Sequence, residues 1–330
     1  MTALVLPRCM RAFFALPRTH AYARAAVGAG ILIALALVVG AEPFLRGLAA
    51  VSAPAVAAAV VLGATATAAA AWRWRILAGR LGLRLPWTQA VLGYYRSQFL
   101  NSVLVGGVVG DVHRAVWHGR SAADLAQATR AVAAERAAGQ VVQFTLAAAV
   151  LVSLQLWAYA PAVGIVLLAV AIAGVGLIAA TRASVRFREV VRREVSHLRI
   201  AFGTPGTVTR VTVASGIVIT CHVATFLVAC LAVGVAASPE RLLAVSLITV
   251  LAGAIPVSIG GWGPREGAAA WAFAATGLGA TTGIAASTVF GVLVLIALAP
   301  GAAVIAASAF RSSDHRATDA PQQPGRNPTS

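Results

Sequence analysis

The sequence predicts an all-α polytopic membrane protein, a bundle of about eight transmembrane helices. Of its 330 residues, 59% are hydrophobic and 11% are charged, and the mean hydropathy is +0.85. A soluble domain is roughly half apolar and a quarter charged, so lipid is the expected solvent for the excess of apolar side chains. The apolar residues also gather in runs of about 20, the length that crosses a bilayer as a helix.

The net charge of +16 comes from Arg, because the chain contains no Lys. These Arg residues stand in short loops between apolar runs, where positive charge marks the cytoplasmic side of a membrane and contacts anionic headgroups. We therefore expect membrane lipids with anionic or phosphate-bearing headgroups as partners, and no nucleic acid. The three Cys residues show neither disulfide nor metal-ligand spacing.

The N-terminal region predicts a helical hairpin. Residues 1–24 carry four Arg among aromatic side chains and predict a cytoplasmic interfacial lead-in. The run 25–41 is either the first span or a signal peptide, with Val39-Gly40-Ala41 as the cleavage site. The run 49–71 is the second span, and Trp72-Arg73-Trp74-Arg75 follows it as a cytoplasmic flank. Both chain ends are then cytoplasmic.

The run 87–105 is mostly apolar, but it contains Arg96, Gln98 and Asn101. These polar side chains make it unsuitable as a helix that faces lipid. We predict a re-entrant or broken helix that is buried in protein. An amphipathic stretch, 121–139, precedes two clean spans at 141–157 and 162–180.

The most basic loop, 182–199, belongs on the cytoplasmic side. Its acidic residues stand at helical spacing from Arg, so part of it is predicted to be an amphipathic helix. The spans 211–235 and 242–257 follow and are joined by a short outside turn. The cytoplasmic end of the second of these spans is predicted at Gly260–Glu266.

The apolar segment 267–279 either crosses or dips back, since about 13 residues at 1.5 Å each fall short of a 30 Å core. A last span covers 283–310, and the polar tail 312–330 is predicted to be disordered. The transmembrane domain is thus 25–311. Every dense Arg cluster falls on one side, which predicts a multi-pass protein of the cytoplasmic membrane with both termini inside.

Two interrupted segments, 97–114 and 251–267, form a pair. Each is an apolar run that ends in Gly-Gly, then another Gly, then adjacent charged residues. They occupy comparable places in the two halves of the chain and raise the possibility of an inverted repeat. In transporters, matched segments broken by Gly or Pro indicate a central binding site.

A broken helix frees backbone N–H groups that attract phosphate, and Arg can hold a phosphate bidentately. Acidic residues beside the breaks could balance the Arg residues or meet a cationic headgroup. The alternative is that Gly permits close packing and the charges belong to loops or brace the bundle. The candidate binding residues are Arg96, Asn101, Gly106, Gly107, Gly110, Asp111, Arg114, Glu135, Arg136, Gly260, Gly261, Gly263, Arg265 and Glu266.

The sequence gives little support for metal binding, proton transfer or nucleotide binding. Asp111, His113 and His118 lie on no single helical face, which argues against a metal site. His222 lies within a span and could relay protons or simply pack. We find no nucleotide-binding loop, dinucleotide fingerprint or ATPase signature. The sequence therefore predicts neither an enzyme nor a cofactor.

Around the two breaks the chain resembles the lysylphosphatidylglycerol synthase transmembrane-domain family of flippase-like proteins. The matching residues include Asn101, Gly106-Gly107 to Gly110-Asp111, Glu135-Arg136 and 255–267, the last being the most specific. The first motif departs from the family in lacking a Pro near Val105 and in having an extra residue between Gly107 and Gly110. The resemblance covers roughly residues 20–311.

The resemblance implies about eight spans, two re-entrant segments and a role with lipids. In fused members of the family this domain translocates aminoacylated phospholipid between leaflets, and a soluble synthetase domain follows it. Here a short polar tail follows, so we do not expect aminoacyl transfer. The first hypothesis is a flippase for a phospholipid or lipid-linked headgroup. The alternative is a non-transport membrane partner that docks a separately encoded glycosyl- or aminoacyl-lipid transferase through the basic loop.

Overall fold

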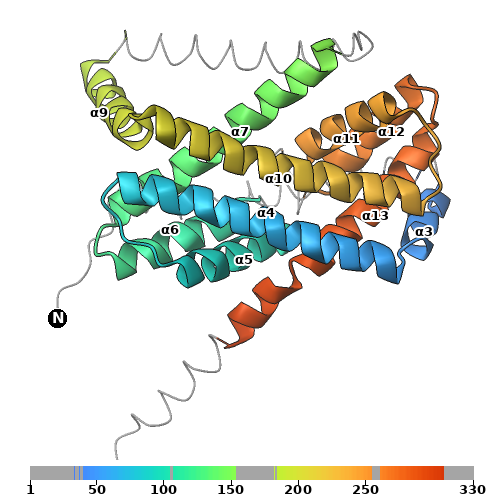
Figure 1. The fold of residues 1–330 in the computed structure, drawn as a ribbon, viewed down its shortest axis with the longest axis horizontal. Helices are drawn as coiled ribbons and strands as arrows, with labels where there is room; N and C mark the ends of the chain where they lie inside the picture. Colours follow the sequence, from blue (N-terminus) through green and yellow to red (C-terminus); the bar gives the residue numbers. More distant parts are fainter. Residues whose placement is uncertain are drawn as a thin grey trace, which may run out of the picture.

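The computed structural model describes residues 40–104, 107–153, 184–254 and 261–307, together with Ile33, Leu37 and Arg182. The elements of this part of the chain are all α-helices (Figure 1). The predicted lead-in 1–24, the predicted span 162–180 and the predicted tail 312–330 lie outside the described residues, as does most of 25–41. The all-helical prediction is confirmed for the part that is described.

Two long helices, α4 (Ala53–Arg80) and α10 (Pro205–Ala232), run antiparallel and side by side (Figure 1). Each begins with a Pro in its first turn, where the missing N–H is not needed. Each has 28 residues, which corresponds to roughly 42 Å. In the described part of the chain, α4, α10 and the stretch Ala280–Ala307 are long and apolar enough to cross a membrane. This confirms the predicted spans at 49–71, 211–235 and 283–310 as apolar helices.

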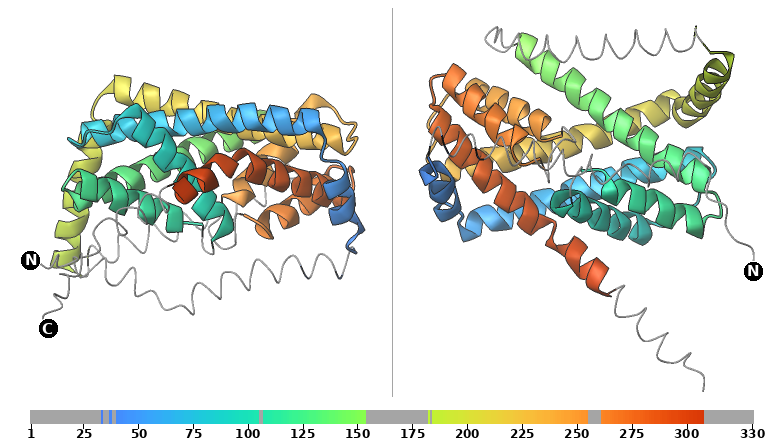
Figure 2. Two further views of the ribbon diagram at one scale, coloured as in Figure 1. Left: turned by 90° about the horizontal axis from the view of Figure 1, so that it is seen from below. Right: turned by 180° about the vertical axis from the view of Figure 1, so that it is seen from behind.

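Two pairs of shorter helices lie on one face of α4 and α10 (Figure 2). The first pair is α5 (Trp87–Val103) and α6 (Val109–Ser121), and the second is α11 (Pro239–Gly253) and α12 (Pro264–Ala275). The partners of each pair pack against each other. These helices have 12 to 17 residues, fewer than the roughly 20 that cross a bilayer core. We name the segments between the partners the first break (residues 104–108) and the second break (residues 254–263).

The predicted span at 242–257 corresponds to α11, whose last residue lies four positions before the predicted end. Helix α11 ends at Gly253, and α12 starts back at Pro264. Helix α12 then turns into α13 (Ala280–Ala297) through a short connection. At 12 residues, or roughly 18 Å, α12 is too short to cross a core about 30 Å thick. Hydropathy alone gave no sign of where this chain segment reverses.

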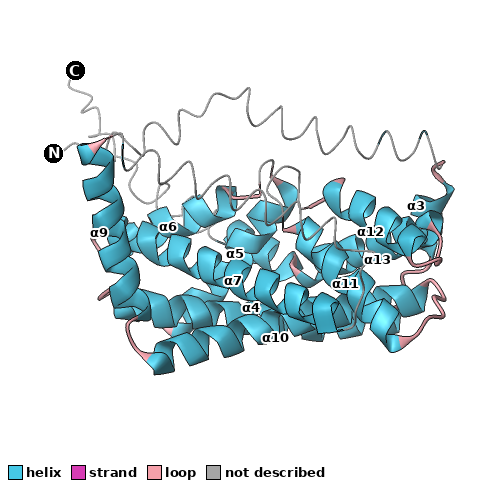
Figure 3. Cartoon of the chain, turned by 90° about the horizontal axis from the view of Figure 1, so that it is seen from above, coloured by secondary structure: helices cyan, strands magenta, loops and turns pink. Residues whose placement is uncertain are grey.

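Three further helices complete the described fold, and the first of them, α3 (Glu42–Ala49), packs against α13. Helix α7 (Leu125–Ser153) is continuous, so residues 125–139 of the predicted amphipathic stretch and residues 141–153 of the predicted span belong to one helix. Helix α9 (Val185–Phe202) is the predicted amphipathic helix, and it lies at one end of the bundle, across the direction of α4 and α10 (Figure 3).

The bundle has one hydrophobic core toward each end. One core joins the C-terminal half of α4 to α5, α6, α7 and the start of α10. The other joins the N-terminal half of α4 to the end of α10 and to α11, α12 and α13. Helices α4 and α10 belong to both cores. The middle of these two helices is therefore where the fold can leave space, and the candidate site lies there.

Candidate functional site

Two adjoining cavities of about 240 Å³ and 230 Å³ lie between the two cores. They share the side chains of Gln98, Arg136, Gln140 and His222, and together we name them the central chamber. Both breaks contribute to it: Gly107 belongs to the first, and Ala254 and Gly261 belong to the second. The helix ends beside them contribute Asn101, Ser102 and Gly253. The two segments paired by sequence therefore meet at one polar space.

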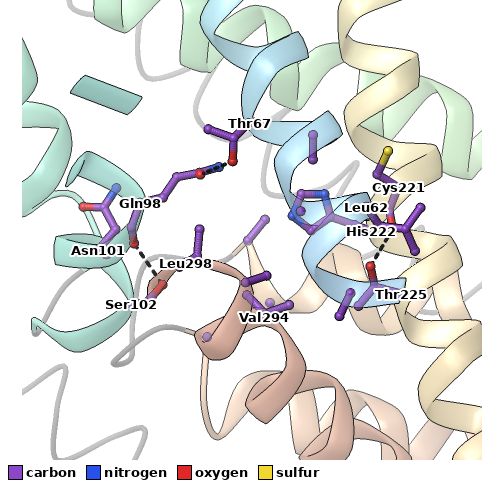
Figure 4. Close-up of a pocket in the computed structure, with 18 of the residues that line it drawn as sticks. Leu62, Thr67, Gln98, Asn101, Ser102, Cys221, His222, Thr225, Val294 and Leu298 are labelled. Carbon is purple, nitrogen blue, oxygen red and sulfur yellow. Dashed lines mark hydrogen bonds between the residues drawn. The ribbon is translucent and has the colours of Figure 1, made fainter. Parts of the chain in front are cut away.

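The walls of the chamber combine small and polar side chains (Figure 4). Thr67 on α4 donates a hydrogen bond of 2.9 Å to the amide oxygen of Gln98 on α5. The Nδ1 atom of His222 on α10 lies 2.7 Å from the carbonyl oxygen of Val218. That carbonyl can only accept, so a neutral His222 carries its proton on Nδ1 and leaves Nε2 as an acceptor. Among the described lining residues, three are Arg, one is His, and none is Asp or Glu.

Arg136 on α7 is the cation with the clearest access to the chamber. Its side chain is 42% exposed, whereas that of Asp111, with which it pairs at 2.7 Å, is 11% exposed. The Nε atom of Arg136 is buried without a hydrogen-bond partner, and so is Oε1 of Gln140, one helical turn further along α7. Because Arg136 lines both cavities, its exposed surface is surface that a ligand in the chamber can contact.

Arg136 belongs to a network of five charged residues, and the other four are buried. Glu135 accepts hydrogen bonds from Arg73 on α4 and, at 2.8 Å, from Arg114 on α6. Asp111 pairs with Arg114 at 3.1 Å as well as with Arg136. Three guanidinium groups thus share two carboxylates, which leaves an excess of one positive charge. That excess lies beside the chamber, because Arg136 is the member that opens onto it.

The inner part of this network braces the bundle. Arg114 is fully buried, and its guanidinium lies between the rings of Trp74 and Tyr94, at 4.5 and 4.4 Å. Arg73 also donates to Ser215 on α10 at 2.8 Å. Gly139 leaves room for the Arg73 guanidinium, since an added Cβ would stand 2.9 Å from it. These contacts matter because an unpaired charge in a low-dielectric interior is strongly destabilising. The pairing of Arg114 is partial, since its Nη2 bonds both carboxylates while Nε and Nη1 are buried without a hydrogen-bond partner.

The second break carries a compact neutral pair. Arg265 donates to Oε1 of its neighbour Glu266 at 2.7 Å, and Ser287 on α13 donates to the same oxygen at 3.0 Å. The guanidinium of Arg265 lies 4.7 Å from the ring of Trp262 and 5.4 Å from that of Phe290. Both charged residues are buried. Arg265 reaches the wall of the chamber, but its charge is balanced locally.

Two of the backbone N–H groups at the breaks, those of Gly110 and Gly263, are already bonded to side chains. The N–H of Gly110 donates to Asn101 Oδ1 at 2.7 Å, and the N–H of Gly263 donates to Glu266 Oε2 at 2.7 Å. Gly110 lies so close to Ser97 that any side chain would collide with its backbone carbonyl. At these two residues the polar side chain nearest the break has capped the helix itself.

The predicted site residues thus separate into groups. Those that line the chamber are Asn101, Gly107, Arg136, Gly261 and Arg265. Those that lie behind its wall are Gly110, Asp111, Arg114, Glu135, Gly263 and Glu266. Arg96 lies away from the chamber, 5.1 Å from the ring of Trp117. Gly106 and Gly260 lie outside the described residues.

Sequence reasoning missed several members of the site. Arg73 was assigned to a cytoplasmic flank, yet it is buried and bonded to Glu135. Gln140 carried no signal beyond being a polar residue within an apolar run. His118, considered as a metal ligand, instead contacts the ring of Trp74 at 5.3 Å and the carbonyl of Arg84 at 3.2 Å. In the part of the chain that the structure describes, no group of His, Cys, Asp and Glu could hold a metal ion.

The comparison with protein families gives one match, to a model described as the lysylphosphatidylglycerol synthase TM region, over residues 23–301. No curated protein and no solved structure matches the chain significantly. The family match covers most of the chain and contains both breaks, the charged network and the chamber. Together with the long apolar helices, it establishes a helical membrane protein with a lipid-related role. The chain belongs to the lysylphosphatidylglycerol synthase transmembrane family.

Proposed function

We propose that the protein translocates a phospholipid or lipid-linked headgroup between the leaflets of the cytoplasmic membrane. The observation that carries this proposal is the central chamber. Both breaks border it, it lies between the two cores, and the side chain of Arg136, which is 42% exposed, lines both of its cavities. A phosphate that enters the chamber can accept hydrogen bonds from this guanidinium, while the acyl chains stay in lipid.

In this proposal the two short-helix pairs are re-entrant hairpins within a bundle of about eight spans. The pair α5 and α6 packs in one core and the pair α11 and α12 in the other, so the hairpins enter from opposite ends (Figure 1). Such an arrangement suits an inverted repeat with a binding site at the bilayer midplane. The end that carries α9 is then cytoplasmic, since α9 has five exposed Arg residues, and both termini lie on that side.

The chamber also supplies neutral groups that suit a headgroup. Gln140 stands one turn from Arg136, and the amide groups of Gln98 and Asn101 lie on the wall formed by α5. Amides donate and accept, so they can bond hydroxyls as well as phosphate oxygens. Arg136 would therefore bind the phosphate, and the surrounding amides would orient the rest of the headgroup.

The test is a leaflet-exchange assay in proteoliposomes that contain the full chain and a fluorescent phosphatidylglycerol. Loss of a hydrogen bond to a charged group costs about 1.5–3 kcal/mol, so Arg136→Gln should slow translocation by at least about tenfold. Arg241→Gln, a matched change at an exposed residue of α11, should leave the rate unchanged. Equal rates for Arg136→Gln and the unmodified chain would remove Arg136 from the mechanism, and no exchange by any form would contradict translocation.

A second candidate function is favoured by α9. Its apolar face reaches α4 and α7, where Ala201 is buried and Glu194 bonds Arg130 at 2.8 Å. The opposite face presents five exposed Arg residues, namely Arg186, Arg188, Arg192, Arg193 and Arg199. Such a surface suits an acidic protein partner, and the proposed partner is a separately encoded glycosyl- or aminoacyl-lipid transferase.

This second function predicts that transferase activity co-purifies with the protein from native membranes. Changing Arg188 and Arg192 to Gln should abolish the co-purification, because both side chains lie on the exposed face. The paired change of Arg210 and Arg241 to Gln removes the same charge elsewhere on the exposed surface and should have no effect. Activity that remains with the α9 variant would argue against docking through this helix.

A further inference from the structure

The acidic side chains near the chamber are few, and all of them are engaged. The chain has 10 Asp and Glu residues. Three of them, Asp111, Glu135 and Glu266, are buried, and each belongs to the structure around the breaks. The internal segments outside the described residues, 105–106, 154–181 and 255–260, contain neither Asp nor Glu in the sequence. The acidic groups available to a ligand in the chamber are therefore these three carboxylates.

Each of the six oxygen atoms of these carboxylates already accepts a hydrogen bond or an ion pair. Asp111 Oδ1 contacts Ser97 and Arg114, and its Oδ2 contacts Asn101 and Arg136. The two oxygens of Glu135 contact Arg73, Tyr94 and Arg114, and those of Glu266 contact Arg265, Ser287 and the N–H of Gly263. A carboxylate that is paired with a guanidinium group and whose two oxygens both accept hydrogen bonds has little attraction left for an ammonium ion.

The aromatic rings near the chamber also already contact positively charged side chains of the protein. A cage of aromatic rings is the other common receptor for an ammonium group. The rings of Trp74 and Tyr94 face the guanidinium of Arg114, at 4.5 and 4.4 Å. The rings of Trp262 and Phe290 face that of Arg265, at 4.7 and 5.4 Å. These four rings already bind cations that belong to the protein itself.

The charged side chains in and around the chamber have a positive net charge. Four buried or chamber-lining Arg residues, Arg73, Arg114, Arg136 and Arg265, stand against three carboxylates. An anion in the chamber neutralises the excess, whereas an ammonium group in the same space adds to it. Water screens this repulsion less inside the protein than at a surface, because the effective dielectric constant is lower there.

We propose that the chamber selects headgroups that carry phosphate and no ammonium, such as phosphoglycerol. Phosphoethanolamine, phosphocholine and aminoacylated phosphoglycerol are excluded, because in the described part of the chain the carboxylates around the chamber and the aromatic rings that line it already contact Arg side chains. This inference rests on the proposed translocation and narrows its substrate class. It also implies that the aminoacylated lipid expected from the fused members of the family is not the cargo of this chain.

Two measurements on the full chain test the selectivity. In proteoliposomes, phosphatidylglycerol should exchange between leaflets at least about tenfold faster than phosphatidylethanolamine or lysylphosphatidylglycerol, because like charges in a binding site cost several kcal/mol. In detergent, native mass spectrometry of competing lipids should show the same preference in binding. Equal rates, or equal binding, for phosphatidylglycerol and the two amine lipids would overturn the selectivity. Exchange of none of the lipids would refute translocation, while the binding comparison would still decide selectivity.

A single side chain should be able to change this preference. Gln140→Glu is nearly isosteric and places a carboxylate one turn from Arg136, on the chamber wall. It cancels the excess positive charge, so the ratio of phosphatidylglycerol to phosphatidylethanolamine binding should fall by about tenfold. Gln127→Glu lies on the same helix but does not line the chamber, and it should leave the ratio unchanged. A ratio that Gln140→Glu also leaves unchanged would overturn the proposal.

Discussion

The two breaks are alike in sequence and different in structure. The charges at the first break belong to a network that spans α4, α5, α6, α7 and α10, through Arg73, Tyr94, Asp111, Glu135 and Ser215. The charges at the second break are two neighbours on α12, held by one serine of α13. The first network has an excess of one positive charge, and the second pair is neutral.

This difference teaches that a matched pattern of Gly and charged residues does not imply a matched role. The second pair fixes the start of α12, since Glu266 both binds Arg265 and caps Gly263. The first network also holds helices together, but one of its members, Arg136, remains open to the chamber. We therefore infer that the first break supplies the charge that binds a ligand, and that the second break mainly supplies shape.

The largest expected effect comes from removing the shared carboxylate of the first network. Glu135→Gln leaves both Arg73 and Arg114 short of a counter-charge in a buried site, which should cost about 3–5 kcal/mol of unfolding free energy. Glu266→Gln strands one Arg and should cost less. Thermal unfolding can be followed with a thiol-reactive dye in a Cys9→Ser background, since Cys221 and Cys230 are buried. An unfolding midpoint lower for Glu266→Gln than for Glu135→Gln would reverse the comparison.

A double change should rescue the second break but not the first. Arg265→Met combined with Glu266→Gln removes both charges and keeps an acceptor for the N–H of Gly263. The double variant should therefore be more stable than the sum of its single changes implies, with a coupling of about 3 kcal/mol. Arg73→Met with Glu135→Gln still removes one of the two carboxylates that pair with Arg114, so the coupling of this double change should be smaller. The same dye-based measurement gives the stabilities of the four single and two double variants. Equal couplings in the two cycles would show that the charges at the two breaks are equally dependent on their partners.

The packing of the first break should be sensitive to one methyl group. Gly110→Ala forces α6 away from the Ser97 carbonyl on α5, which should cost about 2 kcal/mol and slow translocation by displacing Asp111 and hence Arg136. Gly82→Ala is the control, because it has a positive φ of 81° but nothing within 4 Å of an added Cβ. That change should cost about 1 kcal/mol and leave the rate unaltered. A harmless Gly110→Ala would show that the close contact is not needed.

The sequence was sufficient for the helices that carry a strong local pattern. The long apolar runs appear as α4, α10 and α13, and the amphipathic spacing of 182–199 appears as α9. It was insufficient where a contact distant along the chain decides the outcome. The end of α11 depends on Gly261, which approaches the carbonyl of Gly253 so closely that an added Cβ would stand 2.8 Å from it, and hydropathy carries no trace of this.

The roles of individual Arg residues were equally hidden. Arg73 stands in a Trp-Arg-Trp-Arg run that is typical of a membrane interface, and its partner Glu135 is 62 positions away. Arg114 and Arg136 look equivalent in the sequence, yet one is stacked between two rings and the other faces the chamber. Only the pairing across helices separates a structural Arg from one that can bind a ligand, and no local spacing encodes that pairing.

The smallest expected effect concerns a pair far from both breaks, which serves as a reference for them. On α9, the hydrogen bond from Arg130 holds the pKa of Glu194 below its ordinary value. A carboxyl with a lowered pKa stabilises the folded form above its unfolded pKa of roughly 4.3 and loses that contribution as the pH falls below it. The Glu194 side chain is 45% exposed, so the contribution should be no more than about 1 kcal/mol.

A spin label at position 196, in a chain whose three Cys are replaced by Ala, should therefore become more mobile as the pH falls below about 4.3. In Arg130→Gln the mobility should not depend on pH, and a transition that persists in that variant would assign it to another group.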